Sequence, residues 1–539
     1  MTKARIFSKL VAIMTILSIL SFIFTGCGSK DTSSERSNSS DTTTTNVSKT
    51  DNASAQSTKS NTETKRYKIV VYKNGDGQGR QPVDQDPILK VLNETLNIDL
   101  DLNIIESEYE SRLNLLAASG TLPDVMQVTQ KQFESFSSQG LLLDLTPYVE
   151  KMPNFMETYP DYLTNKNLEI DGKHYFLNGV RPEKQQVKSY NSLWIRKDWL
   201  DNLGLDIPKT LDDIYKVAVA FTNNDPDRNG KNDTYGFAGM GGQLGGTYDP
   251  FQPFYGAYGT AMHGSYLLKD NKVVYSTTEE AFKDALGFIK KLIDSGSVDP
   301  DILVTKTFDQ IREKAYKNTI GMMYFTWAEF VKPPYDEQLK TMTPDAEWIQ
   351  IEPPEGPGGK WNGVYSQPGP VSKGYVLSAK LEEEPEKLDK VLEYLDYIVA
   401  GPGSNLVCYG IENVHYKVEN GKIVALDAMS EVSYSWQHQI MGRNEVEYLA
   451  TKFLSNESHI TFAKDLPYLD RYNNFLKIPD GVNAGDKSAY ESEEITKFIY
   501  GKRPLSEFDD FVKTLYDTYQ LQLYIDSVEA NLKEAGLIK

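Results

Sequence analysis

The chain has 539 residues and a formal net charge of −19, with 76 Asp and Glu against 57 Lys and Arg. This acidic balance disfavours nucleic acid as a partner. It also disfavours a polyanionic ligand, unless a local cluster of Arg and Lys overrides the overall field. About 470 residues remain after the N-terminal segments described next, which is enough for two lobes with separate cores.

Residues 1–26 are typical of an export signal peptide. Lys3, Arg5 and Lys9 form a basic start, and a mostly apolar run at 10–24 follows, too short to cross a bilayer as a helix. The next residues, 24–27 (FTGC), resemble the lipobox of bacterial lipoproteins, in which Cys27 would carry the lipid and become the mature N-terminus. An ordinary secretory signal with an incidental cysteine is the alternative.

Residues 27–66 predict a flexible tether behind the lipidated cysteine. They are almost all Ser, Thr, Asn, Asp and Lys, so they cannot bury enough apolar surface to offset the entropy of ordering. Such a tether would hold a folded body clear of a membrane. The second cysteine, Cys408, then has no disulfide partner, and we expect it to be a small buried apolar residue.

The body begins with strands that alternate with helices. Residues 67–72 predict a strand, and a glycine-rich loop, 74–80, follows it. Ligands of open α/β sheets bind outside the carboxyl ends of strands, so Asp76 and Arg80 in this loop are candidate ligand contacts. The pattern then predicts, in order, helix 87–96, strand 98–105, helix 108–119, strand 123–128 and helix 133–139, with later helices at 281–293, 388–399 and 506–532. This alternation indicates an α/β fold with a mostly parallel sheet.

Several segments resemble one family. They are 141–148 (LLLDLTPY), 171–175 (DGKHY), 193–204 (LWIRKDWLDNLG) running into 207–214 (IPKTLDDI), and 410–417 (GIENVHYK). Together they resemble the extracellular solute-binding lipoproteins of carbohydrate ABC transporters, the group that includes alginate- and pectin-fragment-binding proteins. The resemblance covers roughly 67–532. It implies a two-lobed periplasmic-binding-protein-like fold, type II-like, with discontinuous lobes, a hinge and a central cleft. Lobe 1 would be 67–185 plus 374–425, and lobe 2 would be 186–373 plus 426–539.

An acidic loop at 225–236 has the spacing of an EF-hand. Oxygen-bearing side chains stand at positions 1, 3, 5 and 9, a backbone carbonyl would supply position 7, and Gly230 at position 6 permits the tight turn. We therefore expect a structural Ca²⁺ whose candidate ligands are Asp225, Asp227, Asn229, Lys231 and Asp233. Gly236 replaces the bidentate Glu of position 12. Related transport proteins often carry Glu where this chain has Thr234, so the affinity would be weakened. A polar surface turn without metal is the alternative.

Aromatic side chains are candidate platforms for sugar rings, because sugars present an apolar ring face between hydroxyls. The stretch 239–266 is rich in glycine and aromatics and predicts a mobile loop region. The candidate platforms are Tyr248, Tyr255, Trp327, Trp361 and Trp436, although each alone is also compatible with packing. We interpret Trp194 and Trp199 as core. Arg181, Lys184 and Lys188 could serve an acidic sugar, with a solvated charged face as the alternative.

These features predict a lipid-anchored, extracellular substrate-binding protein on the bacterial cell membrane. It would be a monomer that binds an oligosaccharide by cleft closure, without chemistry, and delivers it to the permease subunits of an ABC importer. Nucleic acid is not an expected partner. A secreted carbohydrate-active hydrolase and a cell-surface glycan or peptide adhesin are the alternatives. The sequence has no HExxH, Gly-x-Ser-x-Gly or P-loop motif, and we expect no enzyme activity.

Overall fold

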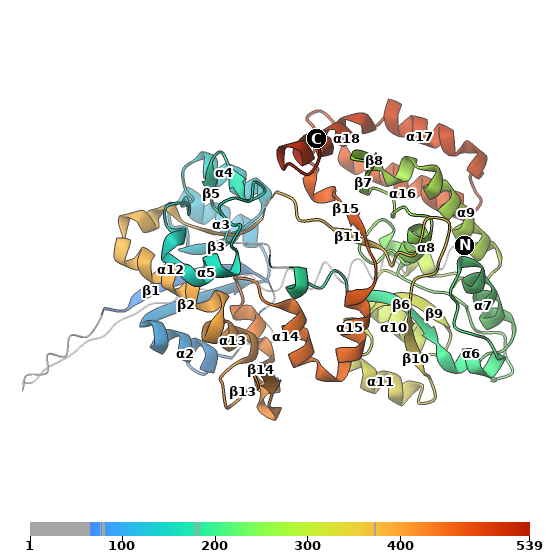
Figure 1. Cartoon of the computed structure of the whole chain (residues 1–539), viewed down its shortest axis with the longest axis horizontal. Coiled ribbons are helices and arrows are strands. Elements are labelled where there is room, and N and C mark those ends of the chain that lie inside the picture. The colour runs from blue at the N-terminus through green and yellow to red at the C-terminus, as the bar shows by residue number, and fades with distance from the viewer. Residues whose placement is uncertain (1–64, 76, 78–80, 178–180, 182, 371–372) are drawn as a thin grey trace, which may run out of the picture. The chain divides into compact units, whose positions relative to one another are not determined.

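The computed structural model describes residues 65–75, 77, 81–177, 181, 183–370 and 373–539 (Figure 1). The predictions for the signal peptide, for Cys27 and nearly all of the tether, and for Asp76 and Arg80 lie outside the described residues. The described chain is mixed α/β, as the sequence predicts, and its two largest sheets have four and three strands.

The first sheet has the strand order β12-β3-β1-β2. Three strands are parallel: β1 (Tyr67–Asn74), β2 (Ile98–Ile105) and β3 (Val125–Val128); β12 (Gly374–Leu377) pairs antiparallel with β3. The associated helices are α2 (Pro87–Leu96), α3 (Tyr109–Ala118), α4 (Gln130–Ser138), α5 (Pro153–Thr158), α12 (Pro385–Val399) and α13 (Gly401–Tyr409). Although α12 and α13 come far later in the chain, both pack against α2 (Figure 1).

The second sheet is antiparallel, with the order β10-β6-β9. Its strands are β6 (Asn191–Arg196), β9 (Met322–Thr326) and β10 (Trp348–Ile351). Every residue of β6 and β9 is buried, as expected of strands with both faces covered. The helices of this region are α6 (Lys197–Leu203), α7 (Leu211–Asn223), α8 (Gln252–Ala257), α9 (Glu280–Asp294), α10 (Phe308–Tyr316), α11 (Tyr335–Met342), α16 (Ala484–Ile499), α17 (Phe508–Asp517) and α18 (Leu521–Glu534).

Smaller elements complete the described chain. Four two-stranded pairs are β4 (Glu169–Ile170) with β5 (Lys173–His174), β7 (Tyr266–Lys269) with β8 (Lys272–Tyr275), β11 (Val364–Ser366) with β15 (Leu469–Arg471), and β13 (Tyr416–Glu419) with β14 (Lys422–Ala425). The 3₁₀ helix η8 (Asp427–His438) precedes α14 (Glu445–Lys452) and α15 (Glu457–Asp465). Because η8 packs on α13, its contacts favour placing 427–438 with the first sheet. The lobe boundaries otherwise stay a prediction.

Local sequence signals account for the elements that the sequence predicts best. Helix α2 has its predicted bounds: the Asp86 carboxylate accepts the N–H groups of Ile88 and Leu89, and Pro87 occupies the first turn. Strand β2 and helices α9 and α12 are also confirmed. The helix predicted at 506–532 is instead two helices, because Gln520 adopts a left-handed conformation with φ 52° between α17 and α18.

The stretch 239–266 is not the mobile loop region that its composition predicts. Phe251, Phe254 and Tyr255 are fully buried, and α8 forms within the stretch. Its glycines serve close packing: a Cβ at Gly256 would lie 2.3 Å from the Trp361 carbonyl oxygen. The error arises because glycine next to aromatics indicates flexibility only when no neighbouring chain packs against it.

Among the described helices, none combines the length and the apolar character that crossing a membrane requires. Cys408 is 3% exposed, and burial raises the pKa of its thiol to about 11, which confirms the prediction of a small buried residue. Trp194 and Trp199 are fully buried, as predicted.

Candidate functional site

A pocket of about 660 Å³ lies at one edge of the first sheet, and we call it the first-sheet pocket. Its wall contains the last residue of β1, the end of β3 and the start of the antiparallel β12. This is the carboxyl edge of the parallel strands, where open α/β sheets hold ligands. The lining residues are Asn74, Tyr109, Gln127, Val128, Thr129, Tyr159, Lys373, Gly374, Tyr375, Gln439, Ile440, Met441 and Gly442.

Tyr109 fixes the strand ends beneath this pocket. Its hydroxyl lies 2.7 Å from the Gln127 carbonyl oxygen and 3.1 Å from that of Tyr72, and it accepts the Gln127 N–H at 3.1 Å. Burial raises the pKa of Tyr109, so the phenol stays neutral at physiological pH. The ends of β1 and β3 are therefore held at a set spacing.

The wall formed by 439–442 is tied to the first sheet through the segment before it. Lys73, in β1, is only 8% exposed, and its Nζ donates to the carbonyls of Trp436, Gln437 and Gln439 at 3.1, 3.1 and 3.2 Å. Burial, aided by the nearby charge of Arg443, lowers the pKa of Lys73 to about 8. The Lys73 ammonium thus donates its hydrogen bonds to backbone carbonyls rather than to a carboxylate.

Two more donors hold the same wall. The Tyr159 hydroxyl donates to the Met441 carbonyl at 2.7 Å, and Arg181 Nη2 donates to the Gly442 carbonyl at 3.1 Å. Arg181, which the sequence offered as a cation for an acidic sugar, therefore positions this segment. Lys184 is exposed and lines neither pocket described here.

A second pocket, of about 350 Å³, lies where β6 begins and β9 ends, and we call it the second-sheet pocket. The paired strands β11 and β15 contribute another part of its wall. The lining residues are Val187, Lys188, Ser189, Tyr190, Asn191, Thr247, Tyr248, Gln252, Met262, Tyr324, Thr326, Val364, Tyr365, Ser366 and Arg471.

Amide side chains set the shape of the second-sheet pocket. Gln252 donates its Nε2 to the Thr247 carbonyl at 2.8 Å and accepts the Val364 N–H on Oε1 at 3.3 Å, which joins two parts of the wall. Gly363 permits this approach, since a Cβ there would lie 2.5 Å from Gln252 Oε1. Asn191 is 4% exposed, and its Oδ1 has no hydrogen-bond partner among the described residues. The pocket wall thus contains a buried oxygen, Asn191 Oδ1, that can accept a further hydrogen bond.

Two of the predicted aromatic platforms are packed inside the protein. Trp327 is 1% exposed and makes edge contacts with the rings of Tyr190 and Phe453. Tyr255 is fully buried and stacked on Phe282 with ring centroids 5.3 Å apart. Neither presents a ring face to solvent in this structure, so burial favours a packing role for both.

The other three candidates are more accessible. Tyr248 is half-buried in the wall of the second-sheet pocket, with its ring edge-on to Phe308. Trp361 is half-buried, lines neither pocket, and donates its indole N–H to the Gly358 carbonyl. Trp436 is 37% exposed, with the Lys73 ammonium 5.2 Å from its ring centroid. That any of the five contacts a ligand stays a prediction.

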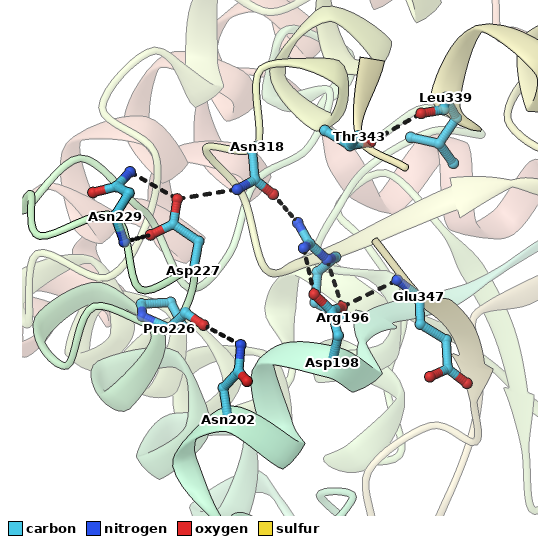
Figure 2. A network of polar contacts seen from close by, with 10 residues as sticks. All are labelled: Arg196, Asp198, Asn202, Pro226, Asp227, Asn229, Asn318, Leu339, Thr343 and Glu347. Carbon is cyan, nitrogen blue, oxygen red and sulfur yellow. Dashed lines mark hydrogen bonds and ion pairs between the residues drawn. The ribbon is translucent and has the colours of Figure 1, made fainter. Parts of the chain in front are cut away.

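The acidic loop forms a tight turn beside α6 (Figure 2). The Asn229 amide donates to Asp227 Oδ2 at 2.8 Å and to Asp233 Oδ1 at 3.2 Å, so these two carboxylates converge on one point. Asp225 accepts the N–H groups of Asn229 and Gly230, both at 3.0 Å. Burial, together with the neighbouring carboxylates of Asp225 and Asp233, raises the pKa of Asp227.

The loop is joined to the second sheet through Asn318 (Figure 2). The Asn318 amide donates to Asp227 Oδ2 at 3.0 Å and accepts from Arg196. Arg196, the last residue of β6, also forms an ion pair with Asp198 at 2.5 Å. The loop is therefore held in place from outside as well as by its own turn.

The structure gives physical reasons for the two departures from an EF-hand. A Cβ at Gly236 would lie 2.2 Å from the Ala218 carbonyl oxygen, so helix α7 excludes any side chain at position 12. Thr234 is 3% exposed and donates its hydroxyl to the Phe221 carbonyl at 2.7 Å. Both positions pack against α7. Within the part of the chain that the structure describes, no cluster of three or more His, Cys, Asp or Glu side chains is arranged to hold a metal ion.

The model of the bacterial extracellular solute-binding protein family matches residues 80–400, more than half of the chain. The chain belongs to this family. Polygalacturonan/rhamnogalacturonan-binding protein YtcQ of Bacillus subtilis (strain 168) is 30% identical over 386 residues, covering 70% of this chain and 72% of YtcQ. Lipoprotein LipO of the same strain is 28% identical over 371 residues, covering 66% of this chain and 69% of LipO.

Solved structures confirm the fold of this solute-binding protein. The Streptococcus pneumoniae ABC-transporter substrate-binding protein FusA in complex with kestose superposes with a TM-score of 0.63 at 19% identity, covering 87% of this chain and 99% of FusA. A structure of a FusA EF-hand mutant with fructo-nystose gives a TM-score of 0.64 with the same coverage. The two-lobed, periplasmic-binding-type α/β fold is therefore established, and the relatives are solute-binding proteins.

Sequence reasoning missed most of the second-sheet pocket, including Gln252, Asn191 and Arg471. No local motif marks them, because the wall joins β11 to β15 across about 100 residues of chain. The partial signals were Tyr248, named above as a candidate platform, and Lys188, named as a cation that could serve an acidic sugar.

Proposed function

We propose that this solute-binding protein captures an oligosaccharide and delivers it unchanged to an ABC importer. The observation that carries the proposal is a pair of pockets, one at an edge of each sheet, walled by tyrosines and by amide and hydroxyl groups. Phenol rings can stack on sugar faces, while amides and hydroxyls can exchange hydrogen bonds with sugar hydroxyls. The names of YtcQ and of the FusA–kestose complex agree with a carbohydrate ligand.

Each pocket would supply half of the binding site. In a two-lobed binding protein the ligand is enclosed when the lobes close about their hinge, so groups from both sheets would contact one ligand. Spare hydrogen-bonding capacity supports this arrangement, as at Asn191 Oδ1. A buried acceptor that lacks a partner costs about 1–3 kcal/mol, and a sugar hydroxyl would remove that penalty.

Binding to a panel of neutral and acidic plant, algal and host oligosaccharides tests the proposal by calorimetry. Tyr365→Ala in the second-sheet pocket should weaken binding by about tenfold or more, because one ring face and one hydroxyl are lost. Tyr516→Ala, on the 37%-exposed ring of α17, is the matched control and should leave affinity unchanged. Absence of binding to every glycan would refute the proposal.

The same incubations distinguish the alternatives. A binding protein returns the glycan intact, whereas a carbohydrate-active hydrolase yields shorter products that chromatography detects. An adhesin would bind but would not support uptake. Deleting the gene in the source bacterium should therefore abolish growth on the bound sugar, if the ABC permease subunits are the partner.

We also propose that the protein is anchored to the outer face of the cell membrane through a lipid on Cys27. The FTGC sequence and the likeness to Lipoprotein LipO support this. Cys27→Ser should release the protein into the medium, and mass spectrometry of the native protein should detect the lipid. Equal retention of both forms in the membrane fraction would contradict the anchor.

For the acidic loop we propose a weak, structural Ca²⁺ site. The donor types fit a hard cation: three carboxylates, the Asn229 amide oxygen and the Lys231 carbonyl. Burial first, and the neighbouring carboxylates second, raise the pKa of Asp227, and a bound cation would stabilise its ionised form. In the absence of a side chain at position 12, we expect millimolar rather than micromolar affinity.

Calorimetry on chelator-treated protein tests the loop. Ca²⁺ should raise the melting temperature of the wild type but not that of Asp227→Asn. Asp517→Asn, an exposed residue at the end of α17, should behave as the wild type. No heat and no thermal shift at 10 mM Ca²⁺, a concentration chosen to exceed the weak range by about tenfold, would leave the loop as a polar turn.

A further inference from the structure

The second-sheet pocket contains an arginine, Arg471, whose charge is not compensated by any carboxylate of the described residues. Arg471, at the end of β15, directs Nε and Nη2 to a single partner, the Ser366 hydroxyl oxygen, at 3.1 and 2.8 Å. A guanidinium has five N–H donors, so three remain for a ligand. No ion pair of Arg471 occurs within the described residues.

Other enclosed arginines of the described chain have a carboxylate or two backbone carbonyls as partners, the latter in the case of Arg181. Four of them pair with a carboxylate: Arg196 with Asp198, Arg312 with Glu329, Arg443 with Glu445, and Arg503 with Glu494. Enclosing a charge without a counter-charge opposes folding, so natural proteins usually pair such groups. An arginine that lacks such a counter-charge but lines a pocket can be explained if a bound ligand supplies the negative charge.

The surroundings of Arg471 strengthen the contrast. No Asp or Glu is found among the described residues that line the pocket, although the whole chain carries a net charge of −19. Lys188 adds a second cation, with its ammonium 5.6 Å from the Tyr365 ring centroid. Burial lowers the pKa of Arg471, and no carboxylate among the described residues acts against this shift. The pocket is thus a local positive site in an acidic protein.

Two other hollows on the described surface have acidic residues in their walls. The hollow beside α9 has Asp212, Asp284 and Glu355 in its wall together with a single lysine. The hollow next to β1 pairs Asp124 with Lys387. In both hollows acidic side chains share the wall with the lysine, whereas no Asp or Glu is found among the described residues that line the second-sheet pocket.

We infer that the bound oligosaccharide is acidic, and that Arg471 receives the carboxylate or sulfate of one sugar unit in the second-sheet pocket. This inference rests on the proposed function. The planar guanidinium offers paired N–H groups that match the two oxygens of a carboxylate. Beside it, Asn191 Oδ1 would accept a ring hydroxyl, and the half-buried Tyr248 would border the sugar ring. The sugars that the relatives' names mention differ, so those names leave the charge of this ligand open.

Calorimetry on the full-length protein tests the inference with matched acidic and neutral ligands. The acidic probes are trigalacturonate and a sulfated trisaccharide, which separate carboxylate from sulfate. The neutral probes are trigalacturonate methyl ester, kestose and maltotriose. We expect an acidic probe to bind best and its affinity to fall as NaCl is raised, because salt screens the charge pair.

Arg471→Gln should weaken binding of the acidic ligand by about 10- to 100-fold, the range expected for hydrogen bonds to a charged group. Arg471→Lys keeps the positive charge but loses the planar pair of N–H donors. Its affinity for the acidic ligand should therefore lie between those of the wild type and Arg471→Gln. Arg112→Gln, an exposed arginine of α3, is the control and should bind as the wild type.

Two results would overturn the inference. Tight binding of a neutral glycan that Arg471→Gln leaves within about twofold would refute the acidic subsite while the proposed function stands. Failure of every glycan in the wider panel to bind would refute both. If Arg471→Gln does not fold, the Arg471→Lys variant and the salt dependence of the wild type decide the question.

Discussion

Lys73, beside the first-sheet pocket, and Arg471, in the second-sheet pocket, are both enclosed cations without an ion-pair partner among the described residues, yet their surroundings differ. The Lys73 ammonium donates to three backbone carbonyls of the segment 436–439. The Arg471 guanidinium meets one serine hydroxyl. A cation whose donors are all used by backbone holds the structure together, whereas one with donors to spare is available to a ligand. Stability and binding measurements can separate these two roles.

The largest expected effect is on stability at Lys73. Lys73→Met should lower the free energy of unfolding by about 3 kcal/mol, because three enclosed carbonyls lose their donor. Urea denaturation of the two proteins measures the difference. The exposed Lys513→Met on α17 is the control, with an expected change below about 0.5 kcal/mol. A loss at Lys73 no greater than at Lys513 would show that the carbonyls find water instead.

The pH dependence of the same pair gives the next largest effect. Burial lowers the pKa of Lys73 to about 8, below the 10.5 of a free lysine, so between these values the unfolded chain retains a proton that the folded chain has released. Stability rises with pH where the unfolded state binds more protons. The wild-type advantage over Lys73→Met should therefore grow by about 2 kcal/mol between pH 7.5 and 10. A constant or shrinking advantage would mean that the carbonyls keep the ammonium charged.

Trp436→Ala tests whether the ring beside Lys73 binds ligand or only the cation. The sequence predicts a sugar platform, but the ring lies outside both pocket walls, so the structure leads us to expect an affinity within about twofold of the wild type. Loss of the cation–π contact should lower the free energy of unfolding by about 1 kcal/mol. Trp436→Phe should recover part of that loss. A tenfold weaker affinity with unchanged stability would restore the platform prediction.

The smallest effect is expected on stability at Arg471. Arg471→Gln should change the free energy of unfolding by less than about 0.5 kcal/mol, because the guanidinium has one hydroxyl partner and its desolvation is relieved. The urea titrations used for Lys73 measure this directly. If Arg471→Gln lowered the free energy of unfolding as much as Lys73→Met does, Arg471 would also be a structural cation, and the difference between the two residues would disappear.

Local signals in the sequence predict much of the secondary structure. The Asp86–Pro87 cap and the apolar stripe that follows fix α2 at its observed bounds, and the period-two run fixes β2. The acidic loop can also be identified from the sequence, because the spacing of its oxygen-bearing side chains depends only on residues close together in the chain. Trp194, Trp199 and Cys408 are buried as predicted. The family resemblance, carried by short contiguous segments, also predicts the two-lobed fold.

The sequence by itself determined the elements whose causes lie within a few residues, such as caps, periodicity and turn spacing. Only the tertiary structure decided which distant residues meet: Ser366 with Arg471, and Lys73 with the carbonyls of 436–439. It also decided that Trp327 and Tyr255 are enclosed while Trp436 is not. The physical reason is that burial and long-range pairing depend on how the whole chain packs, and an aromatic or a cation has the same local signature whether it meets a core, a carbonyl or a ligand.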